Sequence, residues 1–454
     1  MSDDPFASLP TVAGLLEARV GDDHDAYVHD EDRWTWDEVV AETSIRAALL
    51  DEHLDRSRPP HVGVLLDNVP EYLFLIGGAA LAGAAVVGVN PTRRGAELTT
   101  DIAQADCQLV ITTTAHRELL DDDLGVPVLL VDGDDYRRSL ADHAGAGLPA
   151  TSPHPTETLL LLFTSGSTSA PKAVVCSTAR AAITAERAAE AYEVTRDDIA
   201  YCSMPLFHGN AVFACWLPIL WAGGTIVLRD RFSASRFAAD INRHRCTYFT
   251  YVGRSIAYVL ARPPTPEEAD NDLRMGFGTE ASAQDRELFL ERFGCPLVEG
   301  YGSSEGAISI IRGPDTPPAA LGRPREGEQV VVLDPDTGAA CPPARFDDAG
   351  RLVNGDEAIG ELVNPDVGLA FEGYYANDEA TAERLRDGQY WSGDLGYVDE
   401  DGHVYFAGRN ADWLRVDSEN FAAAPVERIL HRFEPVVMAA VYGVPDARTG
   451  DQVM

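Results

Sequence analysis

Hydrophobic positions in the first third of the chain fall into short, nearly continuous apolar runs that alternate with longer amphipathic or alanine-rich stretches. The apolar runs have the length of buried strands, and the stretches between them have helical spacing. Strands are predicted at residues 61–66, 85–89, 108–112 and 126–131, and helices within 33–55 and at 71–83 and 96–104. Such alternation is typical of a doubly wound, largely parallel sheet.

The segment 132–155 is rich in Gly, Pro and Asp and is predicted to be a surface connection. Beyond it the alternation resumes, and near residue 328 it gives way to short strands separated by Gly, Asp and Pro turns. Strands are predicted at 200–204, 225–228, 247–252, 296–299, 329–333, 360–363, 396–399, 403–407 and 436–443, and helices at 178–191, 234–244 and 422–432.

The expected fold class is therefore α/β: a large N-terminal domain of two related α/β halves plus a small β-rich subdomain, followed by the start of a smaller C-terminal α+β domain. The predicted N-terminal domain covers residues 1–409, with its two halves ending at about 325 and the β-rich subdomain at about 326–409. Residues 410–454 are shorter than an ordinary domain, so they are expected to be an incomplete one.

Residues 72–90 carry no charge and are long enough to span a bilayer. They are rich in Gly and Ala and end in Val-Val-Gly-Val-Asn-Pro, so a buried helix followed by a buried strand is the better interpretation. The N-terminus is acidic and lacks the apolar core of a signal peptide. We therefore expect no integral membrane segment and a cytoplasmic location.

The formal net charge is −37, from 73 acidic and 36 basic residues. This excess argues against binding nucleic acid or an anionic membrane by general attraction, and an anionic ligand needs a locally positive site. The cysteines are seven, an odd number, and lack a Cys-x-x-Cys pair. Free thiols in a reducing compartment are therefore expected.

Residues 159–176 read LLLLFTSGSTSAPKAVVC, two apolar strands joined by a small hydroxylated loop. Gly166 lets the backbone approach a ligand closely, and successive N–H groups in a tight turn bind anions. Lys172, the only lysine in the chain, adds a positive charge. These features favour a phosphate-binding loop over an ordinary surface turn, although the loop is not a Walker A motif. The hydroxyl donors are those of Thr164, Ser165, Ser167 and Thr168.

The run FTSGSTSAPK resembles the phosphate loop of the adenylate-forming enzymes, which comprise acyl-CoA synthetases, luciferases and peptide-synthetase adenylation domains. Residues 247–260 and 412–427 look most like the very-long-chain acyl-CoA synthetase and fatty-acid-transport branch. The resemblance covers nearly the whole chain. It implies catalytic roles for Thr164 and Lys172, and ATP, Mg²⁺ and coenzyme A as cofactors or co-substrates.

Residues 300–306 read GYGSSEG and allow two interpretations. Gly-x-Ser-x-Gly is the nucleophile turn of α/β-hydrolases, with Ser304 as nucleophile, but that turn needs a helix after the serine and a strand-like run follows here. The same residues resemble the Tyr-Gly-x-Thr-Glu motif of adenylate-forming enzymes. That resemblance implies that Tyr301 lies against adenine, that Ser304 binds phosphate or the acyl-adenylate, and that Glu305 is a catalytic Mg²⁺ ligand. The implied nucleotide site also includes Gly302, Ser303, Gly278, Thr279 and Glu280.

Three more positions match motifs of the same family. Asp394, in Ser-Gly-Asp-Leu, is implied to bind the ribose hydroxyls, which suits a carboxylate because it only accepts hydrogen bonds. Arg409, in Gly-Arg, is implied to reach the ribose or phosphate. His208 falls where acyl-CoA synthetases carry a catalytic residue beside the substrate carboxylate. A turn aspartate, a surface arginine and a structural histidine are the alternatives.

The combination predicts an ATP-dependent acyl-CoA ligase that activates a lipid-like carboxylic acid, of fatty or steroid type, through an acyl-AMP intermediate and then forms a thioester with coenzyme A. The expected partners are that acid, ATP and coenzyme A, and a homodimer is a possible assembly. Departures from the family pattern at Ser169, Ala411 and Ser418 leave open a degenerate adenylate-binding protein without turnover. The family's C-terminal catalytic lysine is expected beyond Met454.

Overall fold

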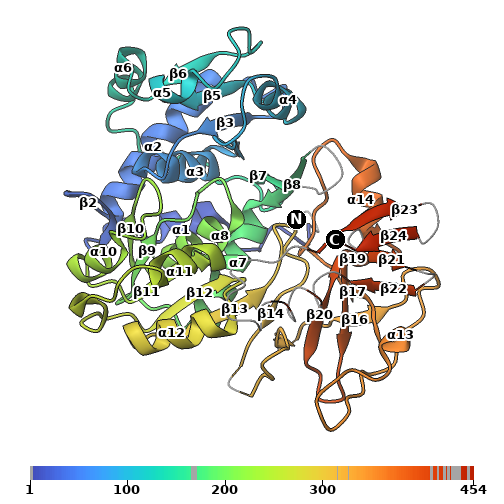
Figure 1. The fold of residues 1–454 in the computed structure, drawn as a ribbon. Helices are drawn as coiled ribbons and strands as arrows, with labels where there is room; N and C mark the ends of the chain where they lie inside the picture. The colour runs from blue at the N-terminus through green and yellow to red at the C-terminus, as the bar shows by residue number, and fades with distance from the viewer. Residues whose placement is uncertain are drawn as a thin grey trace. The chain divides into compact units, whose positions relative to one another are not determined.

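Figure 1 shows a computed structural model of the chain, whose described residues are 4–164, 171–313, 315–325, 327–409, 413–416, 419–422, 426, 430, 441–446 and 450–453. Contacts between residues group the chain into two compact units. The first unit comprises residues 1–299 and 372–378, and the second comprises 300–371 and 379–454. The domain limits predicted from the sequence stay a prediction.

A six-stranded sheet in the first unit has the order β6-β5-β3-β4-β7-β8. Its neighbouring strands run parallel, except that β7 and β8 form an antiparallel hairpin. Every residue of β3, β4 and β5 is buried, which explains why their sequences are almost wholly apolar. The strands are β3 (His61–Leu65), β4 (Ala85–Gly88), β5 (Leu109–Thr112), β6 (Val128–Leu130), β7 (Thr158–Thr164) and β8 (Lys172–Ser177).

A second sheet of this unit has the order β13-β12-β11-β9-β10-β1-β2. These strands are also parallel, apart from the antiparallel pair β1–β2. The sequence did not predict β1, which joins the second sheet although it precedes all strands of the first. The strands are β1 (Asp25–His29), β2 (Asp32–Thr35), β9 (Ile199–Cys202), β10 (Thr225–Leu228), β11 (Tyr248–Val252), β12 (Met275–Thr279) and β13 (Leu297–Tyr301).

The predicted helices of the first unit are confirmed as α2, α3, α4, α7 and α10, and the other helices were not predicted. The α2 helix begins with a capping box, in which the Thr35 hydroxyl accepts from the Glu38 amide and the Glu38 carboxylate accepts from the Thr35 amide. A five-residue π-helix, η1 (Val212–Trp216), interrupts the segment after β9. The other helices are α1 (Val12–Glu17), α2 (Trp36–His53), α3 (Pro70–Ala82), α4 (Ala96–Gln104), α5 (Thr114–Arg117), α7 (Thr178–Ala191), α8 (Gly209–Ala211), α9 (Leu217–Ala222), α10 (Phe237–Arg243), α11 (Gly253–Leu260), the 3-10 helix η2 (Pro266–Glu268) and α12 (Ala283–Phe293).

The uncharged stretch 72–90 is a buried helix followed by a buried strand, as predicted. It comprises most of α3, together with β4, and nearly all residues of α3 are buried against other parts of the protein. Throughout the described residues, the helices are too short or too polar to cross a bilayer. All seven cysteines are free thiols, as predicted, and six of them are buried.

The prediction of a surface connection at 132–155 is wrong in its first part, where α6 (Asp134–Asp142) lies. Two acidic residues, Asp134 and Asp135, occupy its first turn, where the helix dipole favours them. One residue anchors the helix: Tyr136 is buried, and its hydroxyl donates to the Glu71 carboxylate. The Gly, Pro and Asp content hid a short helix, in which Tyr136 is the buried residue.

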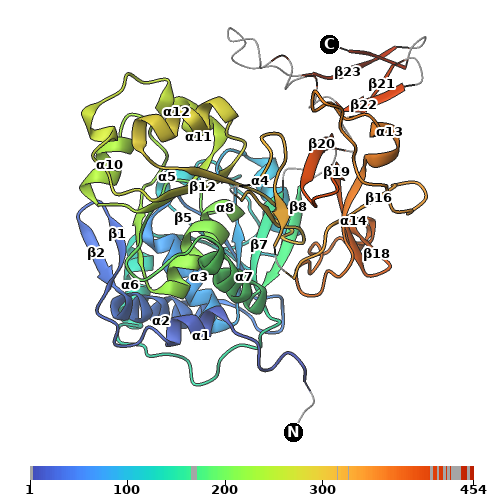
Figure 2. The ribbon, with the colours of Figure 1, turned by 90° about the horizontal axis from the view of Figure 1, so that it is seen from below.

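The second unit is β-rich (Figure 2), and its main sheet has the order β16-β17-β19-β18, with β20 also paired to β19. All of these pairs are antiparallel. The predicted helix at 422–432 and strand at 436–443 lie largely outside the described residues. The elements are β14 (Ile310–Ile311), β15 (Arg323–Pro324), β16 (Val331–Leu333), α13 (Gly355–Ala358), β17 (Gly360–Asn364), α14 (Asp378–Arg384), β18 (Leu385–Arg386), β19 (Gln389–Val398), β20 (Val404–Arg409), β21 (Trp413–Val416), β22 (Glu419–Ala422), β23 (Gly443–Asp446) and β24 (Gly450–Val453).

The predicted fold class is confirmed: parallel α/β sheets occupy the first unit and antiparallel strands the second. The first unit carries the predicted site residues up to Glu280, and the second carries those from Tyr301 onward.

Candidate functional site

The β7–β8 hairpin brings together two residues of the predicted phosphate site. Thr164 ends β7, Lys172 begins β8, and the two are paired across the ladder. The Thr164 hydroxyl donates a long hydrogen bond of 3.4 Å to the Lys172 carbonyl oxygen. The hairpin therefore fixes both ends of the predicted loop. The loop residues themselves, Ser165, Gly166, Ser167 and Thr168, lie outside the described residues.

An aromatic ring faces the only lysine. The Lys172 ammonium lies 5.4 Å from the ring centroid of Tyr374, a favourable cation–π distance. Tyr374 is held there because its neighbours run along β8, with the Tyr375 amide donating to the Ala173 carbonyl at 2.8 Å. The sequence did not predict this contact, since the two residues are far apart in the chain and no motif links them.

His208 follows β9 and precedes the short helix α8. Its ring lies against Phe207, with the ring centroids 4.4 Å apart. The residue reaches solvent, yet protein surrounds enough of the ring that desolvation lowers the pKa of His208 below its usual range. At neutral pH the imidazole is therefore uncharged, and it can act as one donor and one acceptor.

Asn68, just beyond β3, holds the segment that leads to His208. Its Nδ2 donates to the Met204 carbonyl at 2.6 Å, and its Oδ1 accepts from the Leu206 amide at 2.9 Å. The side chain is buried. Sequence reasoning missed this residue, although an asparagine soon after a buried parallel strand is a recognisable signal, because such strand ends carry functional loops.

Three more predicted nucleotide-site residues of this unit lie at the end of β12 and in the turn that follows it. Gly278 and Thr279 end β12, and Glu280 follows with a φ of +68°. Positive φ at a non-glycine residue stores strain, which is common at functional sites. A side chain at Gly278 would overlap the Tyr251 carbonyl oxygen, and one at Gly253 would overlap the Glu280 carbonyl. The turn is therefore pressed against the end of β11 and the start of α11.

An ion pair that the sequence did not predict clamps this turn. The Glu299 carboxylate accepts from the Ala281 amide at 2.5 Å and from Arg286 Nη1 at 2.9 Å. The same guanidinium donates to the Ala281 carbonyl at 2.6 Å. Burial, with Glu299 nearby, raises the pKa of Tyr251 well above its usual value, so its hydroxyl stays protonated. The clamp fixes the backbone around Glu280.

In the second unit, Tyr301 and Asp394 meet directly. The Tyr301 hydroxyl donates to Asp394 Oδ2 at 2.5 Å, and the Tyr301 ring also lies near Phe406. Desolvation, followed by the charge of Asp394, raises the pKa of Tyr301 well above its usual value. Tyr301 therefore remains a hydrogen-bond donor to Asp394 over the whole physiological pH range.

The strand that carries Asp394 is held by buried polar contacts. The Gly393 amide donates to Glu361 at 2.6 Å, and the Ser392 hydroxyl donates to the Leu362 carbonyl at 2.7 Å. Arg409 lies directly opposite Asp394 in the β19–β20 register. The backbone thus brings together the two residues predicted to reach the ribose, while the Arg409 side chain lies outside what the structure describes.

The segment after β13 is a tight turn. The Gly306 amide donates to the Ser303 carbonyl at 2.9 Å, and Gly302 and Ser303 are exposed. Ser304 is half-buried, whereas Glu305 is only 9% exposed. The turn therefore places a nearly buried carboxylate next to the hydroxylated residues Ser303 and Ser304.

Similarity to known proteins establishes the family of this chain. Residues 16–374 match the family described as AMP-binding enzyme. The chain belongs to this family. The chain is 52% identical over 450 residues to the steroid-22-oyl-CoA synthetase of Rhodococcus jostii, covering 98% of this chain and 80% of that protein. It is 44% identical over 446 residues to the medium/long-chain-fatty-acid–CoA ligase FadD17 of Mycobacterium tuberculosis, covering 98% and 85% respectively.

Solved structures agree on the fold. The anthranilate CoA ligase AuaEII in complex with anthranoyl-AMP matches with a TM-score of 0.83, at 21% identity, over 100% of this chain and 87% of that one. ATP-bound MatB from Rhodopseudomonas palustris matches with a TM-score of 0.81, at 23% identity, over 98% and 87%. The resemblance to the adenylate-forming enzymes predicted from the sequence is confirmed.

The α/β-hydrolase alternative for Ser304 is disfavoured in this AMP-binding enzyme. A nucleophile turn needs a helix immediately after the serine. Residues 305–309 are a turn and coil instead, and the strand β14 follows at Ile310–Ile311. The β-branched residues after Ser304 thus favoured strand over helix, as their χ1 restriction suggests.

The donor set around Glu305 fits Mg²⁺. This cation prefers oxygen ligands and usually takes only one or two protein carboxylates, with waters and substrate phosphates completing its shell. A single carboxylate beside the hydroxyls of Ser303 and Ser304 meets that requirement. Glu305 would hold the ion, whose chemistry is to offset charge on phosphate oxygens.

Proposed function

We propose that this AMP-binding enzyme is an ATP-dependent acyl-CoA ligase that activates a lipid-like carboxylic acid, of fatty or steroid type, through an acyl-AMP intermediate. The observation that carries the proposal is the 52% identity to steroid-22-oyl-CoA synthetase along almost the whole chain. The FadD17 ligase, at 44% identity, supports the same reaction on acyl chains. A thioester with coenzyme A is the proposed product.

In the first step, the carboxylate of the acid must approach the α-phosphorus of ATP. Both are negatively charged, and the protein itself has a net charge of −37. Catalysis at phosphorus depends mainly on positioning and charge neutralisation. We assign the β- and γ-phosphates to the loop between Thr164 and Lys172. The Tyr374 ring supports this role, because its cation–π contact helps to position the ammonium.

Ribose binding is assigned to Asp394, with Arg409 opposite. The carboxylate accepts hydrogen bonds only, so it suits a pair of ribose hydroxyls. The Tyr301 hydroxyl fixes Asp394 Oδ2 and thereby orients the carboxylate. In the second unit, the Tyr301 face is assigned to adenine. In the first unit, the Gly278–Glu280 turn is assigned to the nucleotide.

His208 is assigned to the substrate carboxylate. Because its pKa is lowered, it meets the acid as a neutral imidazole and can donate one hydrogen bond without trapping the acid as an ion pair. That suits a carboxylate that must leave this contact to attack phosphorus. The acyl-AMP is then attacked by the coenzyme A thiol, with AMP as the leaving group.

ATP–pyrophosphate exchange that depends on added fatty or steroid acid tests the proposal, with Lys172→Ala as the variant. We expect acid-dependent exchange in the wild type and its loss in the variant. Nucleotide binding without exchange for any acid would instead favour the degenerate adenylate-binding protein, and labelling of Ser304 by a fluorophosphonate without ATP would favour a hydrolase. A cytoplasmic location and a homodimer are further parts of the proposal.

A further inference from the structure

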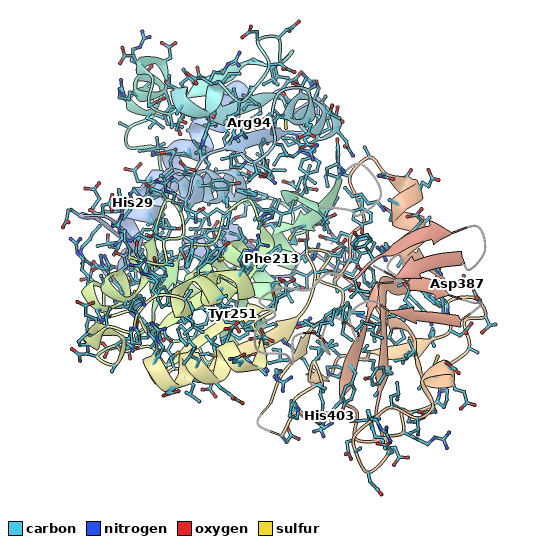
Figure 3. The ribbon with its side chains drawn as sticks, in the orientation of Figure 1. His29, Arg94, Phe213, Tyr251, Asp387 and His403 are labelled. Carbon is cyan, nitrogen blue, oxygen red and sulfur yellow. The ribbon has the colours of Figure 1, made fainter. Side chains whose placement is uncertain are left out.

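Asn210 lies between two parts of the candidate site in the first unit. It belongs to α8, two residues after His208, and its Nδ2 donates to the Tyr251 carbonyl oxygen at 3.4 Å. That carbonyl is the group against which Gly278 is packed. Asn210 thus links the segment assigned to the substrate carboxylate with the turn assigned to the nucleotide (Tyr251 is labelled in Figure 3).

The other half of this amide is unpaired. Asn210 Oδ1 is buried and has no hydrogen-bond partner among the residues that the structure describes. Exchanging the amide oxygen and nitrogen would not give Oδ1 a partner, because the Tyr251 carbonyl is an acceptor and must face the NH₂ group. A buried acceptor without a donor is destabilising, and native proteins keep few of them. A bound ligand that supplies a donor would remove the penalty.

The helix that contains Asn210 continues into irregular helical geometry, which is common at ligand sites. The π-helix η1 follows α8 directly, and π-helical turns are frequent at functional sites. Four of its five residues are buried, and the exception is Phe213, which is half-buried (Figure 3). The segment therefore combines an aromatic side chain that is not fully packed with a buried amide oxygen.

We propose that Asn210 is a specificity-determining residue for the acid, and this rests on the proposed function. Its Oδ1 accepts a hydrogen bond from a hydroxyl on the carbons next to the carboxyl group. The enzyme then prefers hydroxylated acids to unsubstituted acids of the same skeleton. The ionised carboxyl group cannot satisfy Oδ1, since it is an acceptor only, and neither can a plain acyl chain.

Adenine and coenzyme A also carry N–H donors, and the place of Asn210 argues for the acid instead. It lies two residues from His208, which is assigned to the carboxylate. Coenzyme A takes part only after acyl-AMP has formed, so an assay of the first half-reaction excludes its contribution. A neutral hydrogen bond that is made with one substrate and left unmade with the other changes kcat/KM by about tenfold.

The test compares a straight-chain fatty acid with its 2-hydroxy and 3-hydroxy derivatives by pyrophosphate exchange without coenzyme A. In the wild type we expect kcat/KM to be about tenfold higher for one hydroxy acid than for the plain acid. Asn210→Leu should bring that ratio to about one by lowering the rate of the hydroxy acid.

Asn242→Leu is a matched control, because Asn242 on α10 also has a buried, unpartnered Oδ1 and an Nδ2 that donates to a backbone carbonyl, that of Glu267. It should keep the wild-type ratio. Equal kcat/KM for plain and hydroxy acids in the wild type would overturn the inference. So would a ratio that stays high in Asn210→Leu, or an effect confined to the KM for ATP. Absence of any acid-dependent exchange in the wild type would instead defeat the proposed function.

Discussion

At the scale of single residues, the hydrogen bond from the Tyr301 hydroxyl to Asp394 gives a test of nucleotide binding. Tyr301→Phe removes the donor to Asp394 Oδ2 and leaves the ring in place. We expect the KM for ATP to rise about tenfold, because a hydrogen bond to a charged group contributes about 1.5–3 kcal/mol. Steady-state kinetics measures this. Tyr405→Phe is the matched control, since its hydroxyl also donates to a carboxylate of the same unit, Asp399 at 3.0 Å. An equal rise in both variants would contradict the assignment of Asp394 to the ribose.

Asp101 on α4 provides a pH-dependent prediction. The residue is 2% exposed, and desolvation raises its pKa from 3.8 to about 6, although Arg93 lies 2.8 Å away. Between pH 4 and 6 the folded protein holds a proton that the unfolded chain has lost, so this group's contribution to stability falls as the pH rises. The expected loss is about 3 kcal/mol by pH 7.

Asp101→Asn removes this titration. The unfolding free energy of the variant, relative to the wild type, should therefore increase between pH 4 and pH 7, as measured by urea denaturation at several pH values. A difference between the two proteins that does not change with pH would show that Arg93 fully compensates the buried carboxylate.

At the scale of elements, the sequence predicted what depends on local spacing and missed what depends on distant partners. The bounds of α4 and α7 were predicted correctly, because helical periodicity is a local feature, and α7 also follows a capping serine, Ser177. Strand β1 was missed because its place is set by pairing with β10, far along the chain. The site followed the same rule: motif residues such as Asp394 were found, whereas Tyr374 and Glu299 were not.

The contact between β11 and β12 gives an element-scale prediction. Gly278→Ala would place a methyl group on the Tyr251 carbonyl oxygen, and a backbone atom cannot turn aside as a side chain can. The two strand ends must separate, so we expect a loss of about 1–3 kcal/mol of unfolding free energy. Weaker ATP binding should accompany it. Denaturant unfolding and calorimetry measure the two effects. Gly147→Ala, where an added methyl meets nothing within 4 Å, should change neither.

At the scale of the whole molecule, some charged side chains form buried ion pairs, and others are exposed to solvent. Some pairs are buried: Arg229 and Asp240 are 2.9 Å apart, and Arg292 and Glu268 are 2.6 Å apart. Salt screens such pairs only weakly. The remaining acidic excess lies mainly on exposed side chains, where like charges repel one another and individual ion pairs contribute little. Raising the ionic strength should therefore mainly weaken the repulsion between exposed acidic side chains.

We expect the thermal unfolding midpoint to rise by several degrees between about 10 and 500 mM NaCl, because the Debye length shrinks from about 30 Å to less than 8 Å and the self-repulsion of a −37 chain is screened. Differential scanning fluorimetry measures it. KCl at equal ionic strength should act alike, which separates screening from specific ion binding, and sucrose of equal osmolality controls for water activity. A midpoint that falls with NaCl would mean that exposed ion pairs such as Arg33–Asp25, at 2.9 Å, outweigh the repulsion.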